Sequence, residues 1–342
     1  YGKVLRQVLD DPVVDTAIVL FIPPLVTNAS DVAAELIRAC DPPPTKPVLT
    51  CFVGTQGIPD VLRGAVSIPS YTYPESAARA LGHASRRSSW LRRPVGSVPE
   101  FANLDRPLAR TIVDEALRRD QRPWLTQAEV SGLLRAYGII RPGELIVHSA
   151  EEAADAVTQL GAPVAVKLVS DTVIHKSDVG GVRLNLDAPS SAAAAYRAMA
   201  DALIASGRPE AMQGALVQKM IAGGVECIVG VVTDPVFGPL IAFGLGGVAA
   251  EVLGDVAFRL HPLTDIDADE LIASSKAARL LAGFRGAPAA DMGALRDVLL
   301  RVSKLVDDVP EVAELDLNPV VVRPAGDGAY TLDARIRLGP PA

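Results

Sequence analysis

The sequence predicts two α/β regions of different kinds in one chain: a small parallel sheet, followed by a larger α+β unit. Strand and helix signals alternate through residues 1–93, which is typical of a parallel sheet with crossover helices. In residues 123–342 several strand signals follow one another, which indicates a large antiparallel component. Hydrophobic residues make up 49% of the 342 residues and charged residues 21%. That composition supplies ample cores and excludes a disordered or coiled-coil protein.

The first region is expected to form a flavodoxin-like or Rossmann-like half. Either Asn28 or Ser30 can cap the helix after the first strand, because both side chains accept hydrogen bonds from the first helical turn. Pro74 and Glu75 fit the start of a later helix, where proline and acidic residues are favoured. After an initial helix, the expected elements are a strand at Asp15–Ile22, a helix at Ser30–Cys40, a strand at Pro47–Val53, a short helix near Asp60–Arg63, a strand at Val66–Pro69 and a helix at Pro74–Trp90.

Residues 94–122 are rich in proline and mixed charge, and we expect a linker with one helix there. In the larger unit, Thr126 and Glu129 can form a capping box at the start of a helix. The expected helices of residues 123–342 are Thr126–Tyr137, Ala150–Leu160, Ser190–Ala205 and Asp291–Val309. The expected strands are Leu145–His148, Ala165–Val169, Val182–Leu186, Ala215–Met220, Glu226–Val232, Leu240–Phe243, Val320–Arg323 and Ala329–Ala334.

The charge and the cysteines restrict the function. Forty acidic and 33 basic residues give a net charge of -7, which argues against nucleic acid as a partner because phosphate neutralisation needs clustered cations. The three cysteines have no metal-ligand or redox spacing, so we expect reduced thiols in a cytoplasmic protein. The apolar run Thr16–Val26 is too short to span a membrane. The sequence contains no P-loop, GxSxG or HExxH motif, which removes the commonest NTPase and hydrolase alternatives.

A polar turn between two apolar strands is the first candidate site. In DTVIHKSDVGGVR, His175 and Lys176 precede the pair Gly180–Gly181. Paired glycines let backbone amides approach a phosphate, and Lys167, Lys176 and Arg183 supply positive charge. A solvated hairpin loop that contains a histidine would show the same pattern.

The second candidate site is LVQKMIAGGVECIVGVVTD, in which Gln218, Lys219 and Met220 end one strand and Glu226 begins the next. An extended segment with an open main-chain edge can hydrogen-bond an adenine, and a nearby carboxylate can accept a ribose hydroxyl. An ordinary hairpin that turns at Gly223–Gly224 is the alternative, and composition alone favours it.

The third candidate site is ELDLNP, together with Asp333 in TLDAR. Glu314, Asp316 and Asn318 lie two residues apart and therefore on one face of an extended segment. Hard oxygen ligands from neighbouring strands are what Mg²⁺ bound to a nucleotide requires. Acidic residues on a solvent-facing edge would look the same.

The order of these motifs resembles the ATP-grasp part of NDP-forming acyl-CoA synthetases, the relatives of succinyl-CoA synthetase. The resemblance runs almost continuously over about residues 123–338, through LTQAEVSGLLRAYGI, APVAVKLVS, HKSDVGGVRL, VQKM, GVECIVGVVTDPVFGPLIAFGLGG, EVLGDVAFRL, ELDLNPVVV and DARIRL. Residues 1–93 resemble the succinyl-CoA-ligase-type flavodoxin-like domain. The resemblance implies that domain at 1–93, a linker at 94–122 and a two-lobed ATP-grasp domain at 123–342.

The resemblance also implies the reaction acyl-CoA + NDP + phosphate ⇌ carboxylic acid + CoA + NTP, with ATP or ADP and Mg²⁺ as cofactors. His175 resembles the relay histidine that accepts a phosphoryl group. The residues implied to bind the nucleotide are Lys167, Lys176, Gly180, Gly181, Arg183, Gln218, Lys219, Met220 and Glu226. Asn318 and Asp333 are the implied Mg²⁺ ligands, with Glu314 and Asp316 nearby.

The family's CoA-binding half has no counterpart in this sequence, so we expect a fragment or one subunit that works with a CoA-binding domain or subunit, in an oligomer. Two alternatives stay open from the sequence. One is a nucleotide- or acyl-CoA-sensing regulatory module of a larger protein. The other is an ATP-grasp carboxylate–amine ligase, whose acyl-phosphate chemistry needs no relay histidine.

Overall fold

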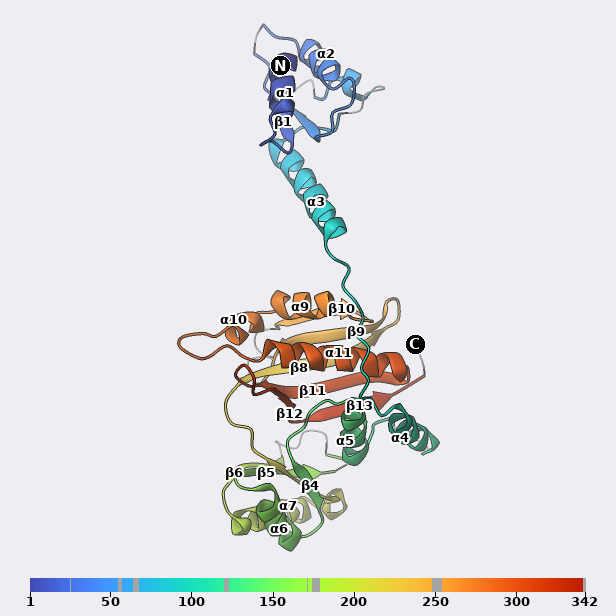
Figure 1. The fold of residues 1–342 in the computed structure, drawn as a ribbon, viewed down its shortest axis with the longest axis vertical. Coiled ribbons are helices and arrows are strands. Elements are labelled where there is room, and N and C mark those ends of the chain that lie inside the picture. Colours follow the sequence, from blue (N-terminus) through green and yellow to red (C-terminus); the bar gives the residue numbers. More distant parts are fainter. Residues whose placement is uncertain are drawn as a thin grey trace. The chain divides into compact units, whose positions relative to one another are not determined.

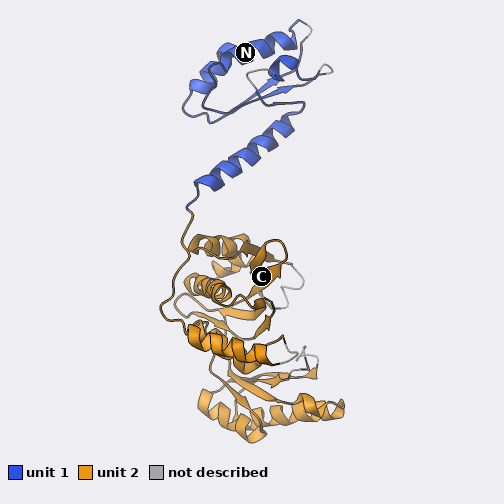
Figure 2. Cartoon of the chain, turned by 90° about the vertical axis from the view of Figure 1, so that its right-hand side faces the viewer, with its two compact units in different colours: residues 1–94 blue, residues 95–342 orange. Residues whose placement is uncertain are grey.

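The computed structural model describes residues 1–24, 26–54, 57–63, 68–119, 123–170, 172–173, 179–247 and 254–340. The chain divides into two compact units, Tyr1–Pro94 and Val95–Ala342, which Figure 2 colours separately. In the described ranges, no helix is long and apolar enough to cross a membrane.

The first unit is a parallel sheet of order β1-β2-β3 with helices on both faces. Leu5 of α1 and Val32 and Leu36 of α2 pack in one cluster with Phe21 and Phe52 of the sheet. On the other face Ala77 of α3 packs against Leu49 and Cys51. The elements are α1 (Gly2–Asp10), β1 (Ala17–Phe21), α2 (Ala29–Ala39), β2 (Val48–Phe52), the 3₁₀ helix η1 (Asp60–Arg63), β3 (Ser70–Tyr71) and α3 (Pro74–Arg92).

Most of the expected elements of this unit are confirmed. Of the two possible caps of α2, Asn28 is the one used, because its side chain accepts a hydrogen bond from the amide of Ser30. Of the strand expected at Val66–Pro69, residues 66 and 67 lie outside the described residues, and the described pairing with β2 is that of Ser70 and Tyr71. The carbonyl of Pro69 accepts the amide of Thr50, while a proline has no amide to continue the ladder in the other direction.

The large lobe of the second unit is a six-stranded sheet with helices against its buried face. The strand order is β10-β9-β8-β11-β12, and β13 also pairs with β11. Its core is built from Val and Leu side chains of the strands and of α4, α5, α9, α10 and α11, and α11 lies along the sheet in Figure 1. The elements are α4 (Arg106–Arg118), α5 (Gln127–Ala136), β8 (Val225–Asp234), β9 (Gly238–Leu245), β10 (Val256–Leu260), α9 (Asp265–Ser274), α10 (Ala277–Leu281), α11 (Met292–Asp308), β11 (Val312–Val322), β12 (Ala329–Thr331) and β13 (Ala334–Leu338).

The small lobe is inserted between α5 and β8. Its antiparallel sheet has the order β4-β7-β5-β6, and α6 and α7 cover the face turned away from the large lobe (Figure 1). The other face of the sheet is therefore turned toward the large lobe. The elements are β4 (Glu144–Val147), α6 (Ala150–Leu160), β5 (Val164–Val169), β6 (Val182–Leu186), α7 (Pro189–Ala205), the 3₁₀ helix η3 (Pro209–Ala211) and β7 (Gly214–Lys219).

Three features of the second unit differ from the sequence expectations. The one helix expected in the linker 94–122 is present as α4, but it buries Ala109 and Val113 in the large-lobe core. The expected strand Ala329–Ala334 is two strands, since β12 pairs with Val320–Val322 and β13 with earlier residues of β11, on either side of a register shift. Strand β10 and helices α9 and α10 were not expected. Alternate residues of β10 are exposed, so its pattern lacks a fully buried side.

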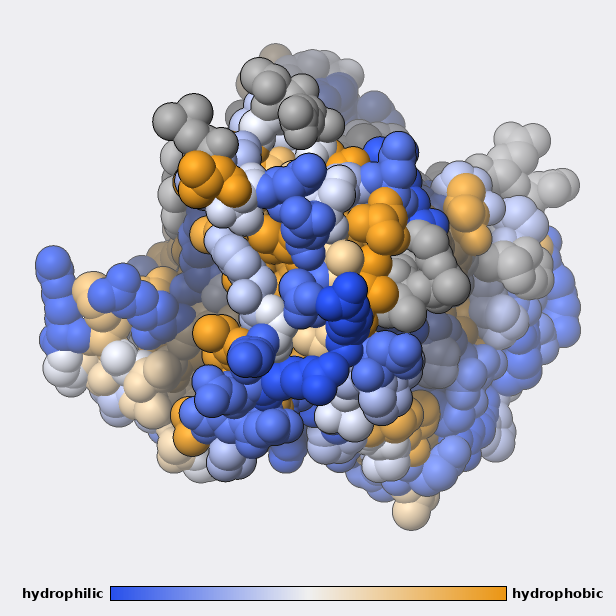
Figure 3. Space-filling model, turned by 90° about the horizontal axis from the view of Figure 1, so that it is seen from above, coloured by the Kyte–Doolittle hydropathy of each residue, from blue (hydrophilic) through white to orange (hydrophobic). Residues whose placement is uncertain are grey.

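Hydrophobic side chains also occur at the surface. On the face shown in Figure 3 they stand singly or in small groups between hydrophilic ones. Scattered exposed hydrophobic residues are normal for a folded protein.

Candidate functional site

The inter-lobe face of the small sheet carries the polar side chains of the candidate site. Strand alternation places Val164, Val166 and Leu168 of β5 in the core under α6 and α7. Lys167 therefore points to the opposite face. The register pairs Ala165 of β5 with Gln218 of β7. Gln218 in turn pairs with Glu144 of β4, so three neighbouring strands bring these polar side chains together.

Lys167 connects the two lobes. Its Nζ donates a hydrogen bond of 2.9 Å to Oε1 of Gln218, within the small lobe. It donates a second one of 2.8 Å to the carbonyl of Leu332, between β12 and β13 of the large lobe. The expected phosphate-binding lysine is thus held beside the residue that precedes Asp333, one of the expected metal ligands.

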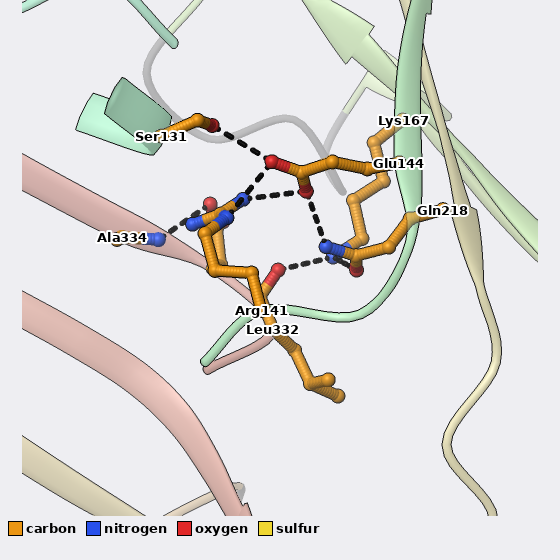
Figure 4. A network of polar contacts seen from close by, with 8 residues as sticks. Ser131, Arg141, Glu144, Lys167, Gln218, Leu332 and Ala334 are labelled. Carbon is orange, nitrogen blue, oxygen red and sulfur yellow. Dashed lines mark hydrogen bonds and ion pairs between the residues drawn. The ribbon is translucent and has the colours of Figure 1, made fainter. Parts of the chain in front are cut away.

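Glu144 lies at the centre of a polar network (Figure 4). Arg141 donates from Nε and Nη2 to its two carboxylate oxygens, both at 2.9 Å. Gln218 donates from Nε2 to Oε2 at 2.8 Å, and the Ser131 hydroxyl to Oε1 at 2.7 Å. We call Ser131, Arg141, Glu144, Lys167 and Gln218 the Glu144 network.

The centre of the network is a buried ion pair whose carboxylate accepts four hydrogen bonds, while Nη1 of Arg141 has no hydrogen-bond partner among the described residues. The side chains of Arg141 and Glu144 are 6% and 14% exposed, and Gln218 is 2% exposed. Burial by itself raises the pKa of Glu144, but the hydrogen bonds and charge of Arg141, with Ser131 and Gln218, bring that pKa below its ordinary value. Glu144 is therefore ionised at neutral pH.

The expected metal ligands Asn318 and Asp333 are brought together by strand pairing. The amide of Asn318 donates to the carbonyl of Asp333 at 3.1 Å. Oδ1 of Asp333 accepts the amide of Ala334 at 2.9 Å. One amide oxygen and one carboxylate suit Mg²⁺, which binds proteins through few oxygen ligands and completes its shell with water and phosphate.

The other two acidic residues of ELDLNP have different surroundings. Glu314 forms an ion pair of 2.5 Å with Arg337 across the strands. Burial raises the pKa of Asp316, while the charge of Arg335 lowers it and that of Asp333 raises it. In the ranges that the structure describes, His, Cys, Asp and Glu form no group of three or more that could hold a metal ion.

The expected adenine and ribose residues lie along the end of β7 and the start of β8. The Gln218 side chain is committed to Glu144 and Lys167, so only the main chain here can present an edge to a base. The amides of Lys219 and Met220 already donate to the carbonyls of Gly143 and Pro163. Glu226 is exposed, and its carboxylate lies against Gly247: a Cβ there would be 2.6 Å from Oε2.

Only part of the expected phosphate loop can be placed. Gly180 has a φ of +66°, a conformation that favours glycine. The exposed Arg183 guanidinium lies beside it, with Nη2 3.3 Å from the position of a Cβ on Gly180. Gly181 accepts the amide of Leu168 through its carbonyl at 2.7 Å. His175 and Lys176 lie outside the described residues.

Sequence reasoning did not find Ser131, Arg141 and Glu144. Arg141 and Glu144 are three residues apart at the start of a strand, and such charged pairs are usually solvated. Only their burial shows that they belong to the protein interior, and that burial follows from the pairing of β4 with β7 and the Ser131 hydrogen bond from α5.

Comparisons with known proteins show the family to which the larger unit belongs. Residues 116–338 match the family model ATP-grasp_5, described as an ATP-grasp domain. The β subunit of acetate–CoA ligase [ADP-forming] II from Pyrococcus furiosus is 41% identical over 232 residues, which are 67% of this chain and 98% of that subunit.

The chain belongs to the ADP-forming acyl-CoA ligase family and contains its ATP-grasp domain. The 4-hydroxybutyrate–CoA ligase [ADP-forming] of Nitrosopumilus maritimus is 36% identical over 341 residues, which are 99% of this chain and 48% of that protein. The chain thus spans about half the length of such single-chain relatives.

Solved structures show the same ATP-grasp fold. The dinucleotide-forming acetyl-coenzyme A synthetase 1 of Candidatus Korarchaeum cryptofilum, in complex with coenzyme A and Ca-AMPCP, has a TM-score of 0.64 and 39% identity, covering 68% of this chain and 100% of its own. Another structure of that enzyme, with Mg-AMPPCP, is described as having its phosphohistidine segment pointing towards the nucleotide binding site. These relatives are CoA ligases, which favours neither the regulatory module nor the carboxylate–amine ligase.

Proposed function

We propose that this chain is the ATP-grasp and phosphoryl-relay portion of an ADP-forming acyl-CoA ligase, with the overall reaction acyl-CoA + ADP + phosphate ⇌ carboxylic acid + CoA + ATP. The observation that carries the proposal is the convergence of Lys167 with the Leu332–Asp333 segment. It brings a cation from the small lobe beside the residue that precedes Asp333, one of the two proposed metal ligands. A nucleoside triphosphate bound with a metal ion requires a cation near its phosphates and oxygen ligands for the metal at the same place.

The nucleotide would lie between the lobes, with its phosphates at Lys167 and the Gly180–Gly181 turn. The end of β7 and Glu226 would hold the adenosine part. Asn318 and Asp333 would hold Mg²⁺, which when bound neutralises charge on the phosphates.

His175 would act as the phosphoryl carrier. In the direction of ATP synthesis a β-phosphate oxygen of ADP attacks the phosphorus of phosphohistidine. The P–O bond forms as the P–N bond breaks, and the electron pair returns to the imidazole. Lys167 and Lys176 would stabilise the negative charge on the phosphoryl oxygens during the transfer. The sequence HKSD and the phosphohistidine segment named for the relative with Mg-AMPPCP support this assignment.

The other half of the reaction would need a CoA-binding domain or subunit of the same enzyme. The match of this chain to nearly the whole length of a β subunit supports that division of labour. We propose that residues 1–93 are the flavodoxin-like ligase domain of the family, and that the assembled enzyme is an oligomer.

The test is phosphoryl labelling. The chain is incubated with Mg²⁺ and ATP labelled at the γ-phosphate, and acid-labile label on histidine is measured. We expect label on His175 and none in the H175A variant. The matched control is H148A, since His148 is an exposed histidine of the same lobe; its label should equal that of the native chain. Equal labelling of H175A and the native chain would refute the relay role.

A further inference from the structure

The Glu144 network contains an amide whose orientation can be deduced. Lys167 can only donate hydrogen bonds, and the Glu144 carboxylate can only accept them. Gln218 lies between these two, with 2.9 Å to Nζ of Lys167 and 2.8 Å to Oε2 of Glu144. Its amide oxygen must therefore face Lys167 and its NH₂ group must face Glu144.

The carboxylate that imposes this orientation is itself held in place. Two nearly parallel bonds from Arg141 fix the plane of the Glu144 carboxylate, and Ser131 on α5 fixes one of its oxygens. Arg141 lies in the segment that carries the chain from α5 to β4, so the carboxylate is anchored where the small lobe joins the large one.

We infer that Glu144 is a positioning residue for nucleotide binding: it keeps the Gln218 amide oxygen toward Lys167 and so holds the Lys167 ammonium at the inter-lobe face. This inference rests on the proposed function, in which Lys167 contacts the nucleotide phosphates. When a nucleotide enters, a phosphate oxygen would replace the Leu332 carbonyl as an acceptor, while Gln218 keeps Nζ in place.

The isosteric variant E144Q tests the inference because it replaces one acceptor oxygen of residue 144 with an NH₂ group, which donates. A glutamine at 144 has an NH₂ group that cannot accept from Arg141 or Gln218. If that NH₂ takes the place of Oε2, it faces Gln218 and Nη2 of Arg141; the Gln218 amide then turns over and presents its own NH₂ to Lys167, which also donates. If it takes the place of Oε1, Ser131 and Nε of Arg141 lose their acceptor and the carboxamide is no longer held where the carboxylate was.

The measurement is the Kd of the 342-residue chain for Mg-AMPPCP and, separately, for adenosine. E144Q should raise the Kd for Mg-AMPPCP roughly tenfold, the cost of a lost hydrogen bond to a charged group. The Kd for adenosine should stay within about twofold, because adenosine has no phosphate for Lys167 to contact. A merely structural role of Glu144 would weaken both ligands alike, and that result would overturn the inference.

Two further variants sharpen the test. The control E151Q removes the same charge from an exposed carboxylate of the same lobe, which pairs with Arg197, and should leave both dissociation constants unchanged. The double variant E144Q/Q218E restores an acceptor facing Lys167, because the new NH₂ at 144 can donate to the carboxylate at 218. It should recover the Kd for Mg-AMPPCP to within about threefold of the native value.

The outcomes separate the two proposals. Absence of saturable Mg-AMPPCP binding by the native chain would count against the proposed function. Native binding with an unchanged or lower Kd in E144Q, or no recovery in the double variant, would count against the positioning role alone.

Discussion

The two lobes of the second unit hold their candidate functional groups by different means. On the small lobe, Lys167 is positioned by a chain of side-chain hydrogen bonds that runs through Gln218 to Glu144 and Arg141. On the large lobe, Asn318 and Asp333 are positioned by the main-chain pairing of β11 with the β12–β13 corner. The cation side of the candidate site, Lys167, therefore depends on a few identifiable side chains, whereas its proposed metal side, Asn318 and Asp333, depends on strand register.

The largest effect is expected at the residue that joins the two sides. K167M removes the ammonium that we propose contacts the phosphates and should raise the Kd for Mg-AMPPCP on the order of 100-fold, the cost of a charge-assisted contact in a partly buried site. Isothermal titration calorimetry would measure it. K276M, which changes an exposed lysine of the large lobe, should bind like the native chain. A K167M variant with native affinity would show that phosphate binding does not use the small-lobe cation.

The side-chain network should also contribute to stability. E144Q leaves the buried Arg141 without its counter-charge, so its free energy of unfolding should be about 2 kcal/mol lower at pH 7. The pKa of Glu144 is lowered in the fold. Its stabilisation is therefore fully present above the ordinary value of 4.5 and is lost as the pH falls through the folded pKa. The difference between native and E144Q should shrink in acid.

Urea unfolding of both proteins in a W90F background would measure this difference, because the sequence has two tryptophans and Trp124 would then report the second unit alone. A difference that stays constant from pH 7 to pH 3 would contradict the assignment of the stabilisation to an ionised Glu144.

The metal side should tolerate an isosteric change better than the cation side. D333N keeps an oxygen ligand and the strand pairing but removes the charge, so the Mg²⁺ concentration that half-saturates nucleotide binding should rise about tenfold. D307N, at a carboxylate of α11 that pairs with Lys304, serves as the control and should change it little. An unchanged Mg²⁺ requirement in D333N would remove Asp333 from the proposed ligands.

The smallest effect on affinity is expected from weakening helix α5, which supports the Glu144 network through Ser131. The Thr126–Glu129 capping box starts α5, which carries Ser131. T126A should cost about 1 kcal/mol in the stability of the second unit, while Mg-AMPPCP affinity should fall by less than about twofold, since Arg141 still holds Glu144. Thermal unfolding and titration of the same sample would measure both. A loss of affinity as large as that of E144Q would show that α5, rather than Arg141, sets the position of Glu144.

Local sequence signals accounted for much of the fold. Val182–Leu186 and Ala150–Leu160 occur with the expected bounds, because the residue pattern of a strand and the Ser149 cap of the helix act within a few residues. The edge strand β10 was not predicted, because its residues are exposed or only partly buried. The division of Ala329–Leu338 into β12 and β13 was not predicted either, because only the pairing with β11 divides that segment into two strands.

The sequence by itself determined which residue types are available for chemistry and in what order: a lysine on an apolar strand, a glycine pair, and the oxygen ligands of ELDLNP and TLDAR. Only the tertiary structure decided that Lys167 meets the carbonyl of Leu332, 165 residues further along the chain. It also decided that the Gln218 side chain accepts a hydrogen bond from Lys167 and donates one to Glu144. The physical reason is that hydrogen bonds between distant strands depend on sheet register and burial, which no local pattern encodes.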